Sequence, residues 1–272
     1  TGARRRPFRL DDHLDRLFRS LRYVRFKLDF TREELAAASH QLIEHNASLL
    51  GEGDELGLVQ FVTAGETAMY AASSGREARQ TATVCAHTFP LAWKSWAERM
   101  RDGARLVTPT VRHVPPQCFE PHMKCRSRMH FYLADQEARL ADPAAVALLL
   151  DLEGNVTETP SANFLMVDDG TIVSPTLRNT LPGVSRQMVI ELAAELGIGF
   201  VERDFQVTSA IDADEAFLAS TPYCLMPVAT INGAPIGGGK PGPMFRKLID
   251  AWGRKVGVAI DRQILDGAAM PE

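Results

Sequence analysis

The second half of the chain is dense in short apolar segments, and this density most limits the folds that the chain can adopt. Two amphipathic helical patterns, over about 184–196 and 243–255, interrupt the segments. Many short strands with few helices favour a barrel-like or α+β domain over a doubly wound sheet. The segments with strand character are ARLVTPTV (104–111), AVALLLDL (145–152), NFLMV (163–167), TIVSP (171–175), FVERDF (200–205), EAFLAS (215–220) and PVATI (227–231).

The first hundred residues show a different pattern, in which helices precede strands. Apolar residues recur at helical spacing over 10–24, and a capping box at 31–34 starts a second helix. Two strand-like segments follow, at 56–65 and 81–89. This half therefore has mixed α/β character.

The length of 272 residues suits one large domain or two modest ones. The stretch 91–103 has the character of a crossover between two such parts. We therefore expect a small N-terminal α/β domain over 1–100 and a larger domain over 104–272.

Composition argues against several classes of function. The net charge is −4, so nothing general points to a nucleic acid or an acidic membrane surface as a partner. The apolar runs are far too short to span a bilayer. The four cysteines form no C-x-x-C pair and do not resemble a disulfide framework, so we expect a reducing, cytoplasmic compartment.

The sequence lacks the common motifs of metal sites and serine hydrolases. The seven histidines show neither an H-E-x-x-H motif nor paired Cys/His spacing, so we predict no metal site. No G-x-S-x-G nucleophile elbow is present.

Glu158 stands in the segment VTETPSANFLMV (156–167), between Thr157 and Thr159. Glutamate is disfavoured in strands, so a carboxylate at this position needs a reason. From the residues alone, Glu158 either serves a site or lies exposed in a turn.

Lys124 precedes an Ala-rich helical segment and is flanked by Met123 and Cys125. Semi-apolar surroundings favour the neutral form of a lysine, and a neutral amine can attack a carbonyl group. The alternative is an ordinary exposed lysine on the surface.

Two later segments could bind an anion. LPGVSR (181–186) enters an amphipathic helix at Val184 and Ser185, where free backbone N–H groups and a hydroxyl can bind a phosphate. FLASTP (217–222) ends a strand in hydroxyl groups, including that of Thr221. An ordinary capped helix and an ordinary turn are the alternatives.

Taken in chain order, these segments resemble the fold-type IV, or class IV, aminotransferase family of pyridoxal-phosphate enzymes. This family includes branched-chain aminotransferases, D-amino-acid transaminases and 4-amino-4-deoxychorismate lyases. The resemblance covers most of residues 8–250 and implies an α+β, two-domain fold, with a small α/β N-terminal domain and a larger pseudo-barrel domain that binds the cofactor. The matching segments are HLDRL (13–17), Lys124 with the following QEA, VTETPSANFLMV, LPGVSR and FLASTPYCLMPV.

The resemblance implies a role for each matched residue. Lys124 would form a Schiff base with pyridoxal 5'-phosphate and then transfer protons. Glu158 would hold the proton on the pyridine nitrogen, with Thr157 and Thr159 supporting its ionised carboxylate. The remaining cofactor-binding residues would be Leu181 at one face of the ring and, at the phosphate, Arg16, Val184, Ser185 and Thr221.

The resemblance predicts an aminotransferase that moves an amino group between an amino acid and a 2-oxo acid, with branched-chain amino acids among the candidates. A lyase similar to 4-amino-4-deoxychorismate lyase and a non-catalytic family member are the alternatives. The family also implies a homodimer.

Three features depart from the family pattern. Branched-chain aminotransferases bind the substrate carboxylate through backbone N–H groups just after the phosphate threonine, whereas here Pro222 follows Thr221 and has no N–H. The Arg-x-His carboxylate trap of D-amino-acid transaminases is missing from VTAGETAMYAAS (62–73). We also expect the N-terminal domain to lack the first strands of the family.

Overall fold

The computed structural model describes residues 6–51, 54–75, 77–78 and 81–269. The chain divides into two compact units: unit 1 contains Thr1–Leu91 and Met123–Arg126, and unit 2 contains Ala92–His122 and Ser127–Glu272. The domain limits predicted above, 1–100 and 104–272, stay a prediction.

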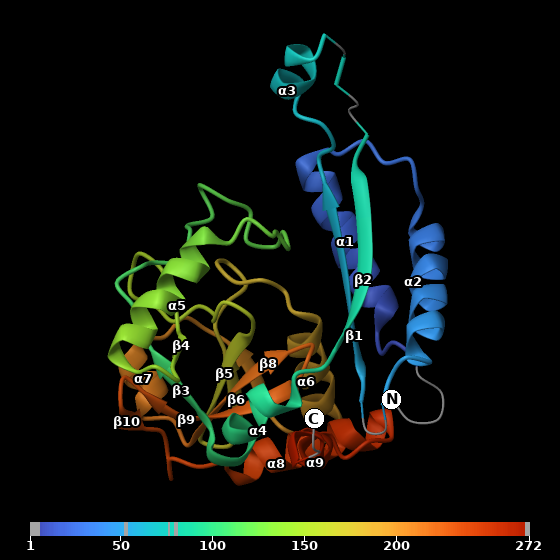
Figure 1. The fold of residues 1–272 in the computed structure, drawn as a ribbon. Coiled ribbons are helices and arrows are strands. Elements are labelled where there is room, and N and C mark those ends of the chain that lie inside the picture. The colour runs from blue at the N-terminus through green and yellow to red at the C-terminus, as the bar shows by residue number, and fades with distance from the viewer. Residues whose placement is uncertain (1–5, 52–53, 76, 79–80, 270–272) are drawn as a thin grey trace. The chain divides into compact units, whose positions relative to one another are not determined.

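Unit 1 combines helices with a two-stranded antiparallel hairpin (Figure 1). The hairpin register runs from Leu56 opposite Pro90 to Thr63 opposite Thr83. The predicted helix over 10–24 is present, and a short helix lies in the connection between the predicted strands. The elements are α1 (Leu10–Val24), α2 (Arg32–Ala47), β1 (Leu56–Thr63), α3 (Ala68–Ser73) and β2 (Thr83–Pro90).

The start of α2 matches the capping box in the sequence. The Thr31 hydroxyl accepts a hydrogen bond from the Glu34 N–H at 3.1 Å. In return, the Thr31 N–H donates to the Glu34 carboxylate at 2.7 Å. Two N–H groups that the helix cannot pair by itself are thereby satisfied.

Unit 2 is built on a mixed sheet with the strand order β4-β3-β9-β8-β5-β6-β7, and β10 pairs with β9. The central pairs β9–β8, β8–β5 and β5–β6 are antiparallel, whereas β4, β3 and β9 run parallel at one end. The strands are β3 (Ala104–Val107), β4 (Val146–Ala147), β5 (Asn163–Asp168), β6 (Thr171–Ser174), β7 (Phe200–Glu202), β8 (Glu215–Ser220), β9 (Cys224–Ile231) and β10 (Ala234–Pro235).

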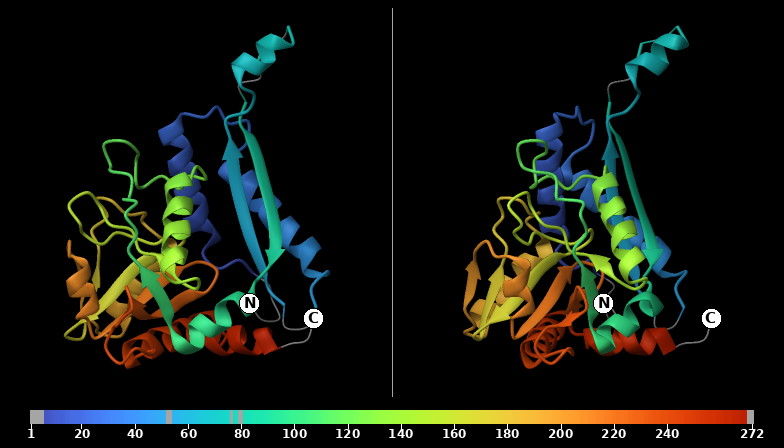
Figure 2. Two further views of the ribbon diagram at one scale, coloured as in Figure 1. Left: turned by 60° about the vertical axis from the view of Figure 1, so that its left-hand side comes forward. Right: turned by 90° about the vertical axis from the view of Figure 1, so that its left-hand side faces the viewer.

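Helices cover this sheet, and α8 and α9 lie along one side of unit 2, drawn in red in Figure 2. The core contains large side chains of the central strands that are fully buried, such as Phe164, Phe217 and Leu225. Burying these side chains is the main source of stability for the unit. The helices are α4 (Trp93–Asp102), α5 (Met129–Ala141), α6 (Val184–Glu195), α7 (Val207–Ile211), α8 (Pro243–Val256) and α9 (Ile260–Ala269).

The segment AVALLLDL differs from its prediction, because only Val146–Ala147 joins the sheet as β4. The chain then pairs with a later segment. Leu149 N–H donates to the Glu158 carbonyl at 3.1 Å, and Thr157 N–H donates to the Leu149 carbonyl at 3.0 Å. The apolar run therefore supplies the backbone against which Glu158 is placed.

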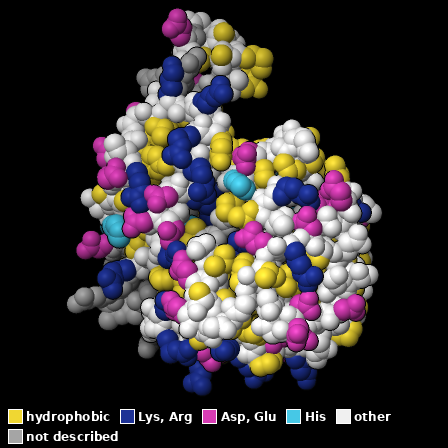
Figure 3. Space-filling view, turned by 180° about the vertical axis from the view of Figure 1, so that it is seen from behind, with side chains coloured by type: hydrophobic (Ala, Val, Ile, Leu, Met, Phe, Trp, Pro, Cys, Tyr) yellow, Lys and Arg dark blue, Asp and Glu magenta, His cyan; other side chains and the backbone are white. Residues whose placement is uncertain are grey.

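Charged side chains of both signs are interspersed over most of the face shown in Figure 3, as expected for a small net charge. None of the helices that the structure describes has the length and apolar character needed to cross a lipid bilayer.

Candidate active site

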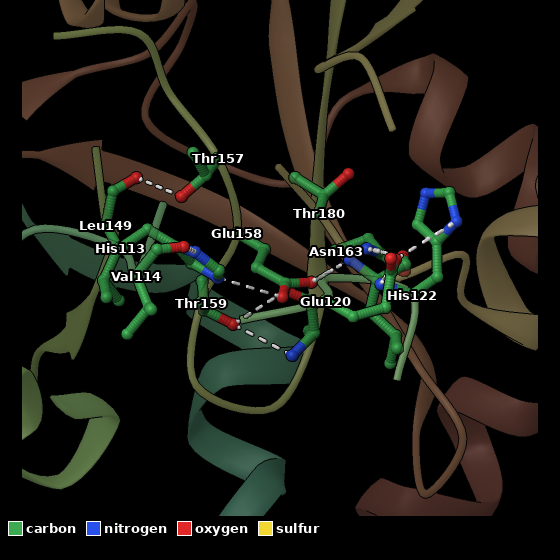
Figure 4. A network of polar contacts seen from close by, with 12 residues as sticks. His113, Val114, Glu120, His122, Leu149, Thr157, Glu158, Thr159, Asn163 and Thr180 are labelled. Carbon is green, nitrogen blue, oxygen red and sulfur yellow. Dashed lines mark hydrogen bonds and ion pairs between the residues drawn. The ribbon is translucent and has the colours of Figure 1, made fainter. Parts of the chain in front are cut away.

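Glu158 lies in unit 2 with only 11% of its side chain exposed. Both of its carboxylate oxygens have nitrogen neighbours, as Figure 4 shows. Oε2 accepts hydrogen bonds from Asn163 Nδ2 at 3.1 Å and from the Leu181 N–H at 3.3 Å. Oε1 lies 3.4 Å from Nε2 of His113. Donors of this kind favour the ionised form of a buried carboxylate.

The hydroxyl groups of Thr157 and Thr159 bind backbone carbonyls and not the Glu158 carboxylate. The Thr157 hydroxyl donates to the Leu149 carbonyl at 2.8 Å, and the Thr159 hydroxyl donates to the Ala162 carbonyl at 3.0 Å. The two hydroxyls therefore fix the backbone before and after Glu158. The prediction that they support the carboxylate is wrong; Asn163 and Leu181 do so instead.

Asn163 connects Glu158 to the turn that precedes α6. Its Nδ2 group also donates to the Leu181 carbonyl at 2.9 Å. A Cβ atom at Gly183 would lie 2.0 Å from Asn163 Oδ1, so only glycine permits this approach. No role was predicted for Asn163, although an asparagine at the start of a buried strand is unusual enough to have signalled one.

The N-terminus of α6 offers donors for an anion. The N-cap residue is Gly183, which has no side chain to cap the first N–H groups of the helix. The first N–H groups of an α-helix lack partners within it, and the helix dipole favours a negative charge there. Val184 and the buried Ser185 stand at this end. The helix begins where LPGVSR predicted it, and the anion site there stays a prediction.

Arg186 comes next in the chain, and its side chain has partners within the fold. Its Nε donates to the Ser174 hydroxyl at 2.9 Å, and its Nη2 lies 2.7 Å from a Glu202 oxygen. Its guanidinium also lies over the Phe200 ring, 5.4 Å from the centroid. This side chain therefore ties α6 to β6 and β7.

The turn between β8 and β9 holds the last predicted residue, Thr221. The preceding Ser220 is buried, and its hydroxyl donates to the Ser161 carbonyl at 2.7 Å. Thr221 and Pro222 are exposed. Burial raises the pKa of Tyr223 to about 12, despite hydrogen bonds with Ser220 and Ser161 that act in the opposite direction. Tyr223 therefore stays neutral and helps to hold the turn.

Lys124 and Arg16 both belong to unit 1. The Lys124 N–H donates to the Ser20 hydroxyl at 3.2 Å, and that hydroxyl donates to the Arg16 carbonyl at 2.9 Å. Lys124 is exposed, whereas Ser20 is buried. Lys124 lies far from α1 along the chain, so the sequence alone offered no reason to connect it with Ser20.

His13 shows the electrostatic character of this part of unit 1. Its Nδ1 lies 3.4 Å from Arg16 Nη2. The pKa of His13 is lowered to about 4, mainly by burial and next by the charge of Arg16; Lys124 and Arg9 act in the same direction and Asp12 opposes them. A neutral His13 can accept a hydrogen bond from Arg16. The surrounding positive charge favours an anion.

The family model described as "Amino-transferase class IV" matches residues 2–231. The chain belongs to the class IV aminotransferase family. Membership confirms the predicted family and the α+β, two-domain fold class. It also confirms the predicted enzyme class and cofactor, because class IV aminotransferases are transferases that depend on pyridoxal 5'-phosphate.

Relatives and solved structures agree with this assignment. Branched-chain-amino-acid aminotransferase-like protein 1 of Arabidopsis thaliana is 30% identical over 245 residues, which make up 90% of this chain and 42% of that protein. The branched-chain-amino-acid aminotransferase of Pseudomonas aeruginosa is 29% identical over 251 residues, 90% of this chain and 77% of that protein. A branched-chain amino acid aminotransferase from Thermobaculum terrenum in its PLP-form superposes with a TM-score of 0.78 at 26% identity, covering 97% and 83% of the two chains.

This class IV aminotransferase carries groups whose chemistry fits pyridoxal 5'-phosphate. A phosphate requires N–H, hydroxyl and cationic donors. In unit 2 the start of α6 offers N–H groups and the Ser185 hydroxyl, and unit 1 by itself offers the Arg16 cation. A pyridinium nitrogen requires an ionised carboxylate, which the donors around Glu158 favour. The approach of Gly183 to Asn163 keeps the α6 turn beside that carboxylate.

Within unit 2, hydrogen bonds join Glu158, Asn163 and Leu181, and Val184 and Ser185 follow at the start of α6. Within unit 1, Ser20 joins Arg16 and Lys124. Among the described residues, no three His, Cys, Asp or Glu side chains form a group that could hold a metal ion. A separate pocket of about 830 Å³ in unit 1 contains none of the predicted residues; its lining includes Phe30, Leu35 and Val84.

Proposed function

We propose that this chain is an aminotransferase that moves an amino group between an amino acid and a 2-oxo acid, using pyridoxal 5'-phosphate bound through Lys124. The observation that carries the proposal is the buried Glu158 carboxylate, whose Oε2 has two N–H donors, in a chain of the class IV family. When bound, the cofactor supplies an electron sink for bond cleavage at the substrate α-carbon.

In unit 2, Glu158 holds a proton on the ring nitrogen, and Asn163 and the Leu181 N–H keep the carboxylate ionised and oriented. The Leu181 side chain would lie at one face of the ring. The N–H groups at Val184 and Ser185, the Ser185 hydroxyl and Thr221 bind the phosphate. The roles of Leu181, Val184, Ser185 and Thr221 are the ones that the sequence predicted for them.

In unit 1, Lys124 would hold the cofactor through its aldehyde carbon, and its amine, when free, would move a proton at the substrate α-carbon. Arg16 adds a cationic contact to the phosphate. The Ser20 hydroxyl joins the backbones of these two residues, so their spacing is set by α1 and not by the exposed loop that contains Lys124.

Branched-chain amino acids are the first substrates to test, because both a bacterial and a plant relative carry that name. Pro222 lacks the N–H that would serve a substrate carboxylate just after Thr221. We therefore propose that the substrate carboxylate is bound by groups other than the backbone of residue 222.

A panel of amino donors and 2-oxo acid acceptors, followed through the cofactor absorption spectrum, tests this function. We expect the visible band of the loaded protein to shift with a donor and to return with an acceptor. A band that responds to no donor would favour a lyase or another substrate class. No band after addition of pyridoxal 5'-phosphate would indicate a non-catalytic member of the family.

We also propose a homodimer. The exposed side chains of Met129, Tyr132, Leu133 and Leu140 lie along α5 at helical spacing, and such apolar exposure favours cover by another protein surface. Light scattering should give twice the mass of one chain, and a Leu140→Glu variant should shift the protein towards the mass of one chain. A single-chain mass for the unaltered protein would refute the dimer.

A cytoplasmic location is the last part of the proposal. All four cysteines, Cys85, Cys118, Cys125 and Cys224, are free in the structure. Free thiols persist in reducing compartments. Localisation of a tagged protein by fractionation tests this, and recovery outside the cytoplasm would contradict it.

A further inference from the structure

A buried histidine that the roles above leave unused lies against Glu158. His113 follows β3 in the chain, and its N–H donates to the Leu150 carbonyl at 2.9 Å. Two aromatic rings meet its imidazole edge-on: that of His130, with centroids 5.7 Å apart, and that of Phe131, at 5.4 Å. Its side chain is 7% exposed. Backbone and packing therefore fix the direction of the ring.

The two ring nitrogens of His113 have different neighbours, as Figure 4 shows. Nδ1 lies 3.1 Å from the Val114 carbonyl oxygen. A carbonyl oxygen only accepts hydrogen bonds, so Nδ1 carries a proton. Nε2 is buried, lies 3.4 Å from Glu158 Oε1 and has no hydrogen-bond partner among the described residues.

This geometry requires a proton between His113 and Glu158. If Nε2 and the carboxylate were both unprotonated, a nitrogen lone pair would face an anionic oxygen in a buried place, which is unfavourable. Oε2 already accepts two N–H donors, and such donors favour the ionised carboxylate. The proton between the two groups therefore belongs on Nε2, beside Glu158 Oε1.

Other titratable and charged groups lie near the His113 ring. Burial lowers the pKa of His130, and the charges of His113 and Arg128 lower it further. The Arg128 guanidinium lies over the Phe131 ring, 4.5 Å from the centroid. Glu158 is the carboxylate that faces the His113 ring.

We propose that His113 is a positioning residue: a protonated imidazole that forms an ion pair with Glu158 and keeps this carboxylate ionised and oriented for the ring nitrogen of the cofactor. The ion pair itself follows from contacts within unit 2. Its use at the cofactor rests on the function proposed above.

The first test uses the protein without cofactor and needs no activity. In ¹⁵N spectra of histidine-labelled protein at pH 7, we expect one ring with both nitrogens protonated, which disappears in His113→Gln. Glu158→Gln should return that ring to the neutral form. A neutral His113 in the unaltered protein, or an imidazolium that persists unchanged in Glu158→Gln, would overturn the proposal.

The second test measures cofactor affinity in matched variants. His113→Phe keeps an aromatic ring but removes the charge, and we expect at least about tenfold weaker binding of pyridoxal 5'-phosphate with a shifted absorption band. His113→Gln retains an N–H donor and should bind more tightly than His113→Phe. The control is His130→Phe, which alters the neighbouring ring and should change affinity by less than about twofold.

Several outcomes separate this proposal from the proposed function. Equal affinity and an unchanged band in His113→Phe, or an equal loss in His130→Phe, would refute a special role for His113. If His113→Phe does not fold, the ¹⁵N comparison of the unaltered protein with Glu158→Gln decides. If His113 is an imidazolium but the protein transfers no amino group, the ion pair is supported and the proposed function is refuted. If the protein transfers amino groups but His113 is neutral, the function is supported and the ion pair is refuted.

Discussion

The Ser20 hydroxyl joins the backbones of Lys124 and Arg16, two residues that lie far apart in the sequence. It accepts a hydrogen bond from the Lys124 N–H at 3.2 Å and donates one to the Arg16 carbonyl at 2.9 Å. Because Ser20 is buried in α1, loop residues 123–126 are held by a helix. The backbone of the exposed Lys124 is thereby held in place.

Replacing Ser20 by alanine should leave the Lys124 N–H without this partner and loosen its backbone. We expect a loss of about 1–2 kcal/mol in the free energy of unfolding and weaker cofactor binding. Ser39→Ala is the matched control, because the buried Ser39 hydroxyl similarly joins the Leu35 carbonyl and the Gln60 amide in unit 1. Thermal unfolding and cofactor titration distinguish the two: similar losses of affinity in both variants would contradict a specific role for Ser20.

Replacing Gly183 by alanine should disturb Glu158 through Asn163. The new Cβ would lie 2.0 Å from Asn163 Oδ1, and that side chain cannot move without losing its bonds to Glu158 and Leu181. We expect about 1–3 kcal/mol lower stability and at least about tenfold weaker cofactor binding. Gly238→Ala is the control, since nothing lies within 4 Å of its Cβ position. Gly183→Ala with the affinity of the unaltered protein would show that the contact is unimportant.

Replacing Lys124 by alanine should abolish covalent binding of the cofactor, because the amine is lost. The measurement is the cofactor band that remains after borohydride reduction and denaturation, together with turnover. Lys247→Ala, on the exposed side of α8, should behave as the unaltered protein. Covalent cofactor or normal turnover in Lys124→Ala would remove this lysine from its proposed role.

Replacing Glu158 by glutamine should retain the cofactor and slow proton removal from the substrate α-carbon by at least about 100-fold. An amide cannot hold the proton on the ring nitrogen as an ionised carboxylate does. Rapid mixing with an α-deuterated donor measures this step, and exposed Glu153→Gln serves as the control. An unchanged rate would assign the ring nitrogen to another partner.

His13 should make the stability of the protein depend on pH. The pKa of His13 is lowered to about 4 in the folded chain, mainly by burial and next by Arg16, from an ordinary value of 6.5. Below pH 6.5 the unfolded chain therefore binds more protons, so stability falls between about pH 6.5 and 4, by up to about 3 kcal/mol.

Comparison with His13→Gln isolates this effect from other titrating groups. The difference in free energy of unfolding between the two proteins should be constant above pH 6.5 and should decrease as the pH falls towards 4. Urea unfolding at several pH values measures it. A difference that stays constant over this whole range would mean that His13 is not the group responsible.

The element pattern was largely accessible from the sequence, because it depends on local periodicity. The helices over Leu10–Val24, Val184–Glu195 and Pro243–Val256 and the capping box at Thr31 were anticipated to within a few residues. The short strand in AVALLLDL was not anticipated, since an apolar run of this length fits a long strand as well as a short one. Only the pairing of Leu149 with the Glu158 segment ends that strand early.

The sequence by itself determined the family, the fold class and the order of the candidate residues, since motif spacing survives without coordinates. Only the tertiary structure decided the surroundings of Glu158. The nearest threonines are turned to the backbone, and the carboxylate instead faces Asn163, Leu181 and His113. The physical reason is that a buried charge must be matched by donors, and these donors come from segments that are brought together by sheet pairing and not by proximity along the chain.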